Sequence, residues 1–252
     1  MSGKIELSRR AVLAGGAVLG AGAVTAGLAA TGTAPSALHG LLPGREPIPV
    51  AVLMDAGATM IDFAGPWEVF QDAGVADVPG FSLFTVAPTL TELQTTGTHK
   101  MVAGRHEMSG LKFHADYSFD NAPQPRVLLM GAQRGGVGGS GPAKLDWIRR
   151  AAEKADIVMS VCTGAFILAD TGLIDGLSAT THHEYFDQFA TKFPNVRLQR
   201  GKRFVDNGKF ISAGGLTSGI DAALHVLQRY YGPAAAQAVA DYMEYQSGGW
   251  KA

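Results

Sequence analysis

The sequence predicts an α/β domain in which a doubly wound, mostly parallel sheet is flanked by helices. The expected strands are short, continuous apolar runs, as in strands buried on both faces, and segments of helical periodicity separate them. The expected strands are residues 48–54, 81–87, 126–130 and 156–161, and the expected helices are residues 62–73, 142–155, 165–171, 184–193, 217–230 and 234–245. In such a sheet the ligand crevice lies outside the carboxyl ends of the strands.

Turn-forming residues indicate the connecting segments. Residues 93–115 predict short strands and turns, residues 116–125 a loop, and residues 135–141 a glycine-rich loop. The residues Asp206-Asn207-Gly208 predict a tight hairpin turn within residues 203–213.

Composition and charge exclude several classes of protein. The chain has 252 residues, of which 46% are hydrophobic and 17% charged, so it is globular rather than disordered. Its 21 basic and 22 acidic residues leave a formal net charge of −1, so no basic excess exists for nucleic acid. The single cysteine, Cys162, excludes an intramolecular disulfide and a metal site built of several cysteines.

The N-terminus has the pattern of an export signal. Arg9 and Arg10 precede a stretch without charge from Ala11 to Leu38, which favours a twin-arginine-type signal over residues 1–37. A retained membrane anchor is the alternative, since the stretch is long enough to span a bilayer. We expect a linker over residues 38–46, a folded domain over residues 47–252, an extracytoplasmic location and no membrane contact after processing.

Cys162 stands at the end of an expected strand, directly before a helix. This strand–turn–helix arrangement is that of a nucleophile elbow, which exposes a side chain above the sheet. The positive end of the helix dipole is expected to lower the pKa of the thiol. The alternative is that Cys162 is a small buried hydrophobic residue.

Four motifs, in this order along the chain, resemble the ThiJ/PfpI superfamily, which has the class I glutamine amidotransferase-like, flavodoxin-like fold. They are Asp62 to Phe70 (DFAGPWEVF), Val161 to Gly164 (VCTG), Ala179 to His182 (ATTH) and Gly214 to Asp221 (GGLTSGID). The resemblance covers about residues 48–246 and is nearest to the branch that holds isonitrile hydratases and the ligand-sensing domains of AraC-type regulators.

The resemblance implies roles for individual residues. Cys162 matches the nucleophile, and Asp62 the aspartate that serves isonitrile hydratases as acid and base. Glu68 matches the glutamate that hydrogen-bonds the sulfur and tunes its ionisation. Thr163 matches the threonine beside the nucleophile, and His182 the histidine near it.

Each of these residues also has a structural alternative. Asp62 is a candidate helix N-cap, Glu68 an exposed helix carboxylate, and Thr163 a cap of the elbow helix. His182 is a candidate for supporting its loop. Adjacent side chains such as those of His182 and His183 are expected to point apart, and no cluster of carboxylates or cysteines accompanies them, so we expect no metal and no cofactor.

The superfamily usually follows its third strand with Pro-Gly-Gly, whose N–H groups help to form an oxyanion hole. This chain has Met130-Gly131-Ala132 there. We expect Gly131 and Ala132 to line the substrate site, with a reshaped oxyanion hole.

The favoured function is a cysteine-dependent lyase that hydrates an isonitrile to an N-substituted formamide. The alternatives are a non-catalytic ligand-binding or redox-stress protein, and a glyoxal-processing enzyme. The resemblance implies a small-molecule substrate and a homodimer. No nucleic-acid partner is expected, because the chain leaves no room for a helix-turn-helix domain after the resemblance ends.

Overall fold

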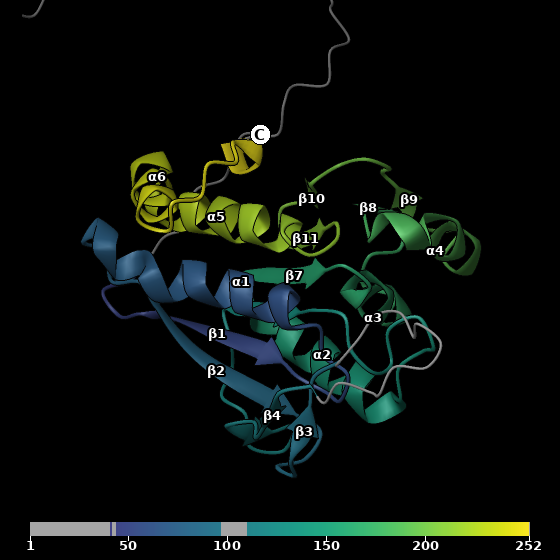
Figure 1. Cartoon of the computed structure of the whole chain (residues 1–252). Helices are drawn as coiled ribbons and strands as arrows, with labels where there is room; N and C mark the ends of the chain where they lie inside the picture. The colour runs from purple at the N-terminus through teal and green to yellow at the C-terminus, as the bar shows by residue number, and fades with distance from the viewer. Residues whose placement is uncertain (1–40, 42–43, 97–109, 252) are drawn as a thin grey trace, which may run out of the picture. The chain divides into compact units, whose positions relative to one another are not determined.

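The structure of the protein is a computed structural model, which describes residue 41 and residues 44–96 and 110–251. The predicted export signal lies outside the described residues. Within them, seven strands form one sheet in the order β10-β11-β7-β6-β1-β2-β5 (Figure 1). These strands are β1 (Ile48–Leu53), β2 (Phe81–Ala87), β5 (Tyr117–Ser118), β6 (Val127–Met130), β7 (Ile157–Val161), β10 (Phe204–Asp206) and β11 (Phe210–Ala213).

The sheet is parallel except at one edge. Parallel pairs join β1 to β2 and β6, β6 to β7, β7 to β11 and β2 to β5, whereas β10 and β11 are antiparallel. The antiparallel pair is the hairpin that residues 206–208 predict. Two small sheets, β3 (Leu93–Gln94) with β4 (Lys112–Phe113) and β8 (Ser178–Ala179) with β9 (Arg197–Leu198), lie outside the main sheet.

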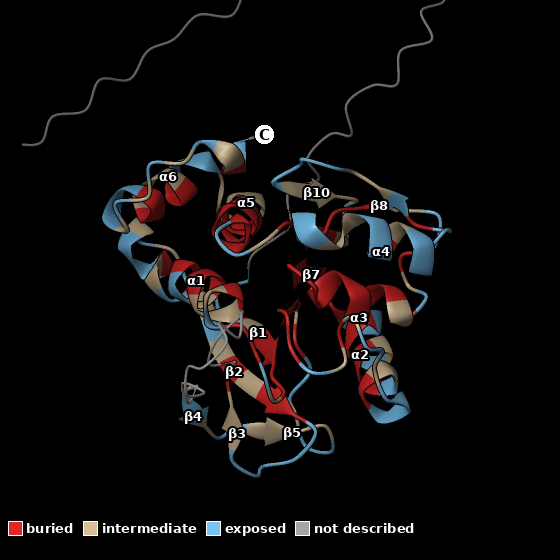
Figure 2. Cartoon of the chain, turned by 45° about the vertical axis from the view of Figure 1, so that its right-hand side comes forward, coloured by how far each residue is buried: buried red, intermediate tan, exposed pale blue. Residues whose placement is uncertain are grey.

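Helices cover both faces of the sheet, as expected for a doubly wound fold. One core cluster joins the strands to α1 (Met60–Gln71), α5 (Ser218–Tyr231) and α6 (Pro233–Tyr242). The other joins the opposite face to α2 (Pro142–Lys154), α3 (Gly164–Asp170) and α4 (Phe186–Lys192). In Figure 2 the buried residues concentrate on the central strands and on α3 and α5.

The first helix begins two residues earlier than expected. Thr59 is its N-cap residue, so Asp62 is the third residue of α1 and is not the cap. Pro66 lies inside the helix. Because proline has no N–H, it leaves the carbonyl of Asp62, four residues earlier, without its helical partner.

Three central strands end at the same edge and bring their following residues together. β1, β6 and β7 are parallel neighbours, and Gly131 and Cys162 directly follow β6 and β7. The site must therefore lie at this carboxyl edge. None of the described helices is long and apolar enough to cross a membrane.

Candidate active site

Cys162 forms a tight elbow between β7 and α3. Its φ of 58° lies in the left-handed region, which is costly for a residue with a side chain. Its backbone N–H holds the turn by donating to the carbonyl of Gly214 at 2.7 Å. Gly164 is required two residues later, because a Cβ there would collide with the carbonyl oxygen of Met130. The predicted elbow geometry is present.

Asp62 reaches the elbow from α1. Its side chain is fully buried, and Oδ2 accepts a hydrogen bond from the backbone N–H of Ala132 at 3.0 Å. A Cβ on Gly131 would lie 2.7 Å from the Cβ of Asp62, so the glycine makes this close approach possible. The other carboxyl oxygen, Oδ1, is buried without a well-formed hydrogen bond. It is therefore the oxygen that is left for a proton or a substrate.

Asp62 and Cys162 shift each other's ionisation. Burial raises the pKa of Asp62 to about 6, although the N–H of Ala132 and the interaction with Cys162 act to lower it. Burial, followed by the negative charge of Asp62, raises the pKa of Cys162 to about 12. At pH 7 the pair thus consists mainly of a carboxylate and a protonated thiol.

The expected lowering of the thiol pKa is wrong. The Thr163 N–H and the Leu216 backbone do act to lower the pKa, but burial and the charge of Asp62 outweigh them. Helix α3 has only seven residues, and Cys162 is 6% exposed. Little water remains to solvate a thiolate there.

Glu68 does not reach the thiol, which corrects the role that the resemblance implied for it. Its side chain is exposed, and it is not among the groups that shift the pKa of Cys162. Six residues of helix separate it from Asp62, about 9 Å along the axis and on another side of the helix. Asp62 is the carboxyl group that interacts with the sulfur.

The other predicted residues lie around this pair. Thr163 is buried, and its hydroxyl makes no capping bond to α3, so it is not a side-chain cap. The Ala132 N–H is engaged by Asp62 and is not a free oxyanion donor. His182 is half-buried, its ring lies against Gly215, and its Nδ1 accepts from the N–H of Glu184 at 3.3 Å.

Leu216 is the residue that sequence reasoning missed. Its backbone lies close to both members of the pair and acts to lower the pKa of Asp62 and of Cys162. Its φ of 54° is again left-handed. The glycines before it signalled a turn, but a leucine carries no polar side chain that would mark it as a site residue.

Two cavities in the described part of the chain are candidate sites. One, of about 340 Å³, lies beside the elbow and is lined by Thr181, His182 and Leu216 among others. Thr181 donates its hydroxyl to the backbone carbonyl of Cys162 at 2.8 Å, so this cavity adjoins the backbone of the elbow.

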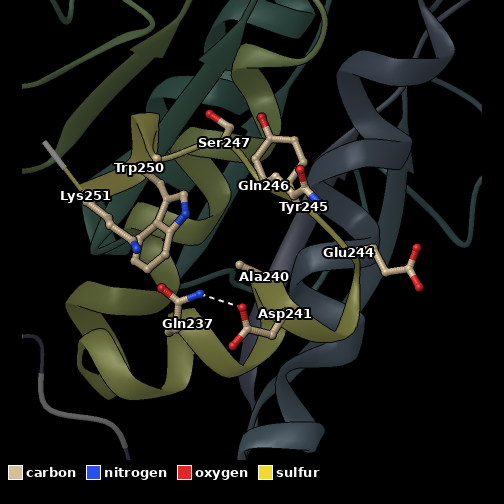
Figure 3. A pocket seen from close by; sticks show the side chains of 10 residues that line it. Gln237, Ala240, Asp241, Glu244, Tyr245, Gln246, Ser247, Trp250 and Lys251 are labelled. Carbon is tan, nitrogen blue, oxygen red and sulfur yellow. Dashed lines mark hydrogen bonds between the residues drawn. The ribbon is translucent and has the colours of Figure 1, made fainter.

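The second cavity, of about 360 Å³, lies between α6 and residues 244–251 (Figure 3). Asp241 and Glu244 line it, and Gln237 donates to Asp241 at 2.6 Å. None of the predicted site residues lines it, whereas His182 lines the first cavity. Cys162 and Asp62 line neither of these two cavities. In the described part of the chain, no three His, Cys, Asp or Glu side chains gather in a way that would hold a metal ion.

The chain is similar in sequence and in fold to known proteins. Over 186 residues the chain is 32% identical to the isonitrile hydratase of Pseudomonas putida, covering 66% of this chain and 77% of that protein. It is 25% identical over 182 residues to the HTH-type transcriptional regulator CdhR of Pseudomonas aeruginosa, covering 68% of this chain and 54% of the regulator. The chain thus spans about half the length of that regulator.

A solved structure shows the same fold. The crystal structure of a ThiJ/PfpI family protein from Pseudomonas syringae matches with a TM-score of 0.67 at 24% identity, covering 80% of this chain and 76% of that one. The family model described as DJ-1/PfpI matches residues 49–229, which include the elbow, Asp62 and Leu216. The chain belongs to the DJ-1/PfpI family.

Proposed function

We propose that the protein is a cysteine-dependent lyase that hydrates an isonitrile, R–N≡C, to the N-substituted formamide. One observation carries this proposal: a buried acid with a pKa of about 6 interacts directly with the only thiol of the chain. A group that titrates near neutral pH both accepts and returns a proton, which hydration requires. The similarity to an isonitrile hydratase supports the same reaction.

In the first half of the reaction, Asp62 accepts the proton of the thiol as the sulfur of Cys162 attacks the isonitrile carbon. A C–S bond forms, and Asp62 delivers the proton to the same carbon. The product is a thioimidate, Cys–S–CH=N–R, bound to the enzyme. Asp62 is again a carboxylate.

In the second half, Asp62 removes a proton from a water molecule as the water oxygen attacks the thioimidate carbon. The proton passes to the nitrogen, and the C–S bond then breaks. The hydroxyl proton of the intermediate returns to the sulfur as the formamide carbonyl forms. One water molecule is consumed, and the thiol is regenerated.

The raised thiol pKa argues against a redox sensor. Oxidation to sulfenic or sulfinic acid begins from the thiolate, which a pKa of about 12 makes rare at neutral pH. Nothing in the site specifically favours a glyoxal-processing reaction.

The test compares two acids on one helix. Cys162→Ala is expected to abolish hydration of an alkyl isonitrile, and Asp62→Asn to lower it by about 10²–10⁴-fold. Glu68→Gln, the matched amide substitution on the exposed side of α1, is expected to keep wild-type turnover. If the wild-type protein hydrates no isonitrile, or if Asp62→Asn keeps full turnover, the proposal fails.

We also propose that residues 1–37 direct export by the twin-arginine route and that the mature protein is a homodimer. The adjacent Arg9 and Arg10 before an uncharged stretch support export. The family resemblance supports the dimer.

A further inference from the structure

The cavity beside the elbow is built on the turn that carries Leu216. Among the residues that line it are Thr181, Lys202, Arg203, Leu216 and Thr217. Leu216 meets the Asp62–Cys162 pair through its backbone, and Thr181 bonds the carbonyl of Cys162. The cavity therefore adjoins the backbone of the elbow, although the side chains of Cys162 and Asp62 do not line it.

The lining of this cavity is cationic. Lys202 and Arg203 belong to it, and none of the described lining residues is an aspartate or a glutamate. Lys202 is exposed and forms no ion pair with the described residues. Its ammonium group is thus available to a ligand.

The guanidinium group of Arg203 is fixed by hydrogen bonds to Asp221. Its Nε donates to the fully buried carboxylate of Asp221 at 2.6 Å, and Nη2 bonds the same group. Asp221 also accepts from Ser247 at 3.0 Å. The Nη1 edge makes only a long 3.4 Å contact with Thr217, so a rigidly oriented donor remains beside the cavity.

The charges select a monoanion. Lys202 and Arg203 each carry one positive charge. Asp221, which is bonded to Arg203, carries one negative charge, so the net charge of the three side chains is +1. A carboxylate has the single negative charge and the two acceptor oxygens that match an ammonium group and one guanidinium edge.

We propose that this cavity binds a carboxylate on the substrate that Cys162 attacks, so that the preferred substrate carries its anionic group a few bonds from the reacting carbon. The inference deepens the proposed function and rests on it for the nature of the electrophile. The residues that recognise the anion are Lys202 and the Nη1 edge of Arg203.

One experiment uses the reaction. An isocyano-carboxylate is expected to have a kcat/KM about tenfold above that of its primary amide, since a charge-assisted hydrogen bond distinguishes the two. Lys202→Met is expected to remove this preference and Lys202→Glu to reverse it. Lys202→Arg is expected to retain it. Lys154→Met, on an exposed lysine at the end of α2, is the matched control and keeps the preference.

A second experiment does not depend on hydration. Cys162 is alkylated with iodoacetyl-glycine and with iodoacetyl-glycinamide, and each rate is divided by that of N-acetylcysteine amide. We expect wild-type protein and Lys154→Met to favour the anionic reagent about tenfold, and Lys202→Met to lose the preference. Equal ratios in wild-type protein and Lys202→Met would overturn the inference. If no isonitrile is hydrated, the proposed function fails, and the alkylation ratio still decides the carboxylate site.

Discussion

Oδ2 of Asp62 accepts a 3.0 Å hydrogen bond from the backbone N–H of Ala132, a residue 70 positions later in the chain. The bond ties the first turn of α1 to the carboxyl end of β6. It orients the acid toward Cys162 and uses an N–H group that the family resemblance had suggested for an oxyanion hole. The N–H thus positions the acid that would transfer the proton.

The thiol of Cys162 is expected to titrate above the ordinary cysteine value of about 8.5. Burial and the Asp62 carboxylate both disfavour the thiolate. Alkylation by iodoacetamide, followed by mass spectrometry against pH, should therefore inflect above pH 8.5. Asp62→Asn removes the negative charge and should move the inflection to lower pH. An inflection below pH 8.5 in the wild-type protein would contradict the described electrostatics.

Asp62 makes stability depend on pH. Its pKa in the folded protein is about 6, against an ordinary value of 3.8, so the folded state binds more protons between these two values. The free energy of unfolding should fall as pH rises from about 4 to about 6, by about 3 kcal/mol for a shift of roughly two pKa units. The stabilising contribution of protonated Asp62 is fully present below about pH 4 and is lost as the pH rises through about 6.

The measurement for this pH effect is a difference between two proteins, because other groups titrate in the same range. Asp206, for example, has a lowered pKa and so contributes in the opposite direction. Urea unfolding of wild-type protein and Asp62→Asn at several pH values should show similar stabilities near pH 4, with the variant more stable at pH 7.5. Parallel curves for the two proteins would exclude the assignment to Asp62.

Gly131→Ala is expected to displace Asp62, because the new Cβ would lie 2.7 Å from the Cβ of the acid. Overpacking of this kind typically costs about 1–3 kcal/mol of stability. The displaced carboxylate should also affect the thiol less, so the alkylation inflection should move to lower pH. Gly138→Ala is the control, since a Cβ there meets nothing within 4 Å. The same alkylation profile in both variants would show that Asp62 tolerates a side chain at position 131.

Replacement of both Arg9 and Arg10 by lysine is expected to leave folded protein in the cytoplasm. The twin-arginine pair is the feature on which the proposed route depends. Cell fractionation followed by immunoblotting checks this outcome. Unchanged export would argue for another route.

Much of the fold and part of the site follow from local sequence. The apolar runs predict the four central strands, because a strand buried on both faces needs continuous apolar residues. Residues 206–208 predict the hairpin through their turn preferences, and the position of Cys162 between a strand and a helix predicts the elbow. Each of these features depends on residues that are neighbours in the chain.

Tertiary structure decided the properties of the site. Which acid reaches the sulfur depends on how α1 packs against α5, β2 and β6, and this packing buries Asp62 while Glu68 stays exposed. The direction of the thiol pKa shift depends on burial and on a carboxylate 100 positions away in the chain. The cationic cavity likewise combines Lys202 and Arg203 with residues 181–183, 186 and 214–218. Burial and the distances between charged groups set these pKa shifts. The sequence identifies the ionisable residues, but only the tertiary structure gives their burial and the distances between them.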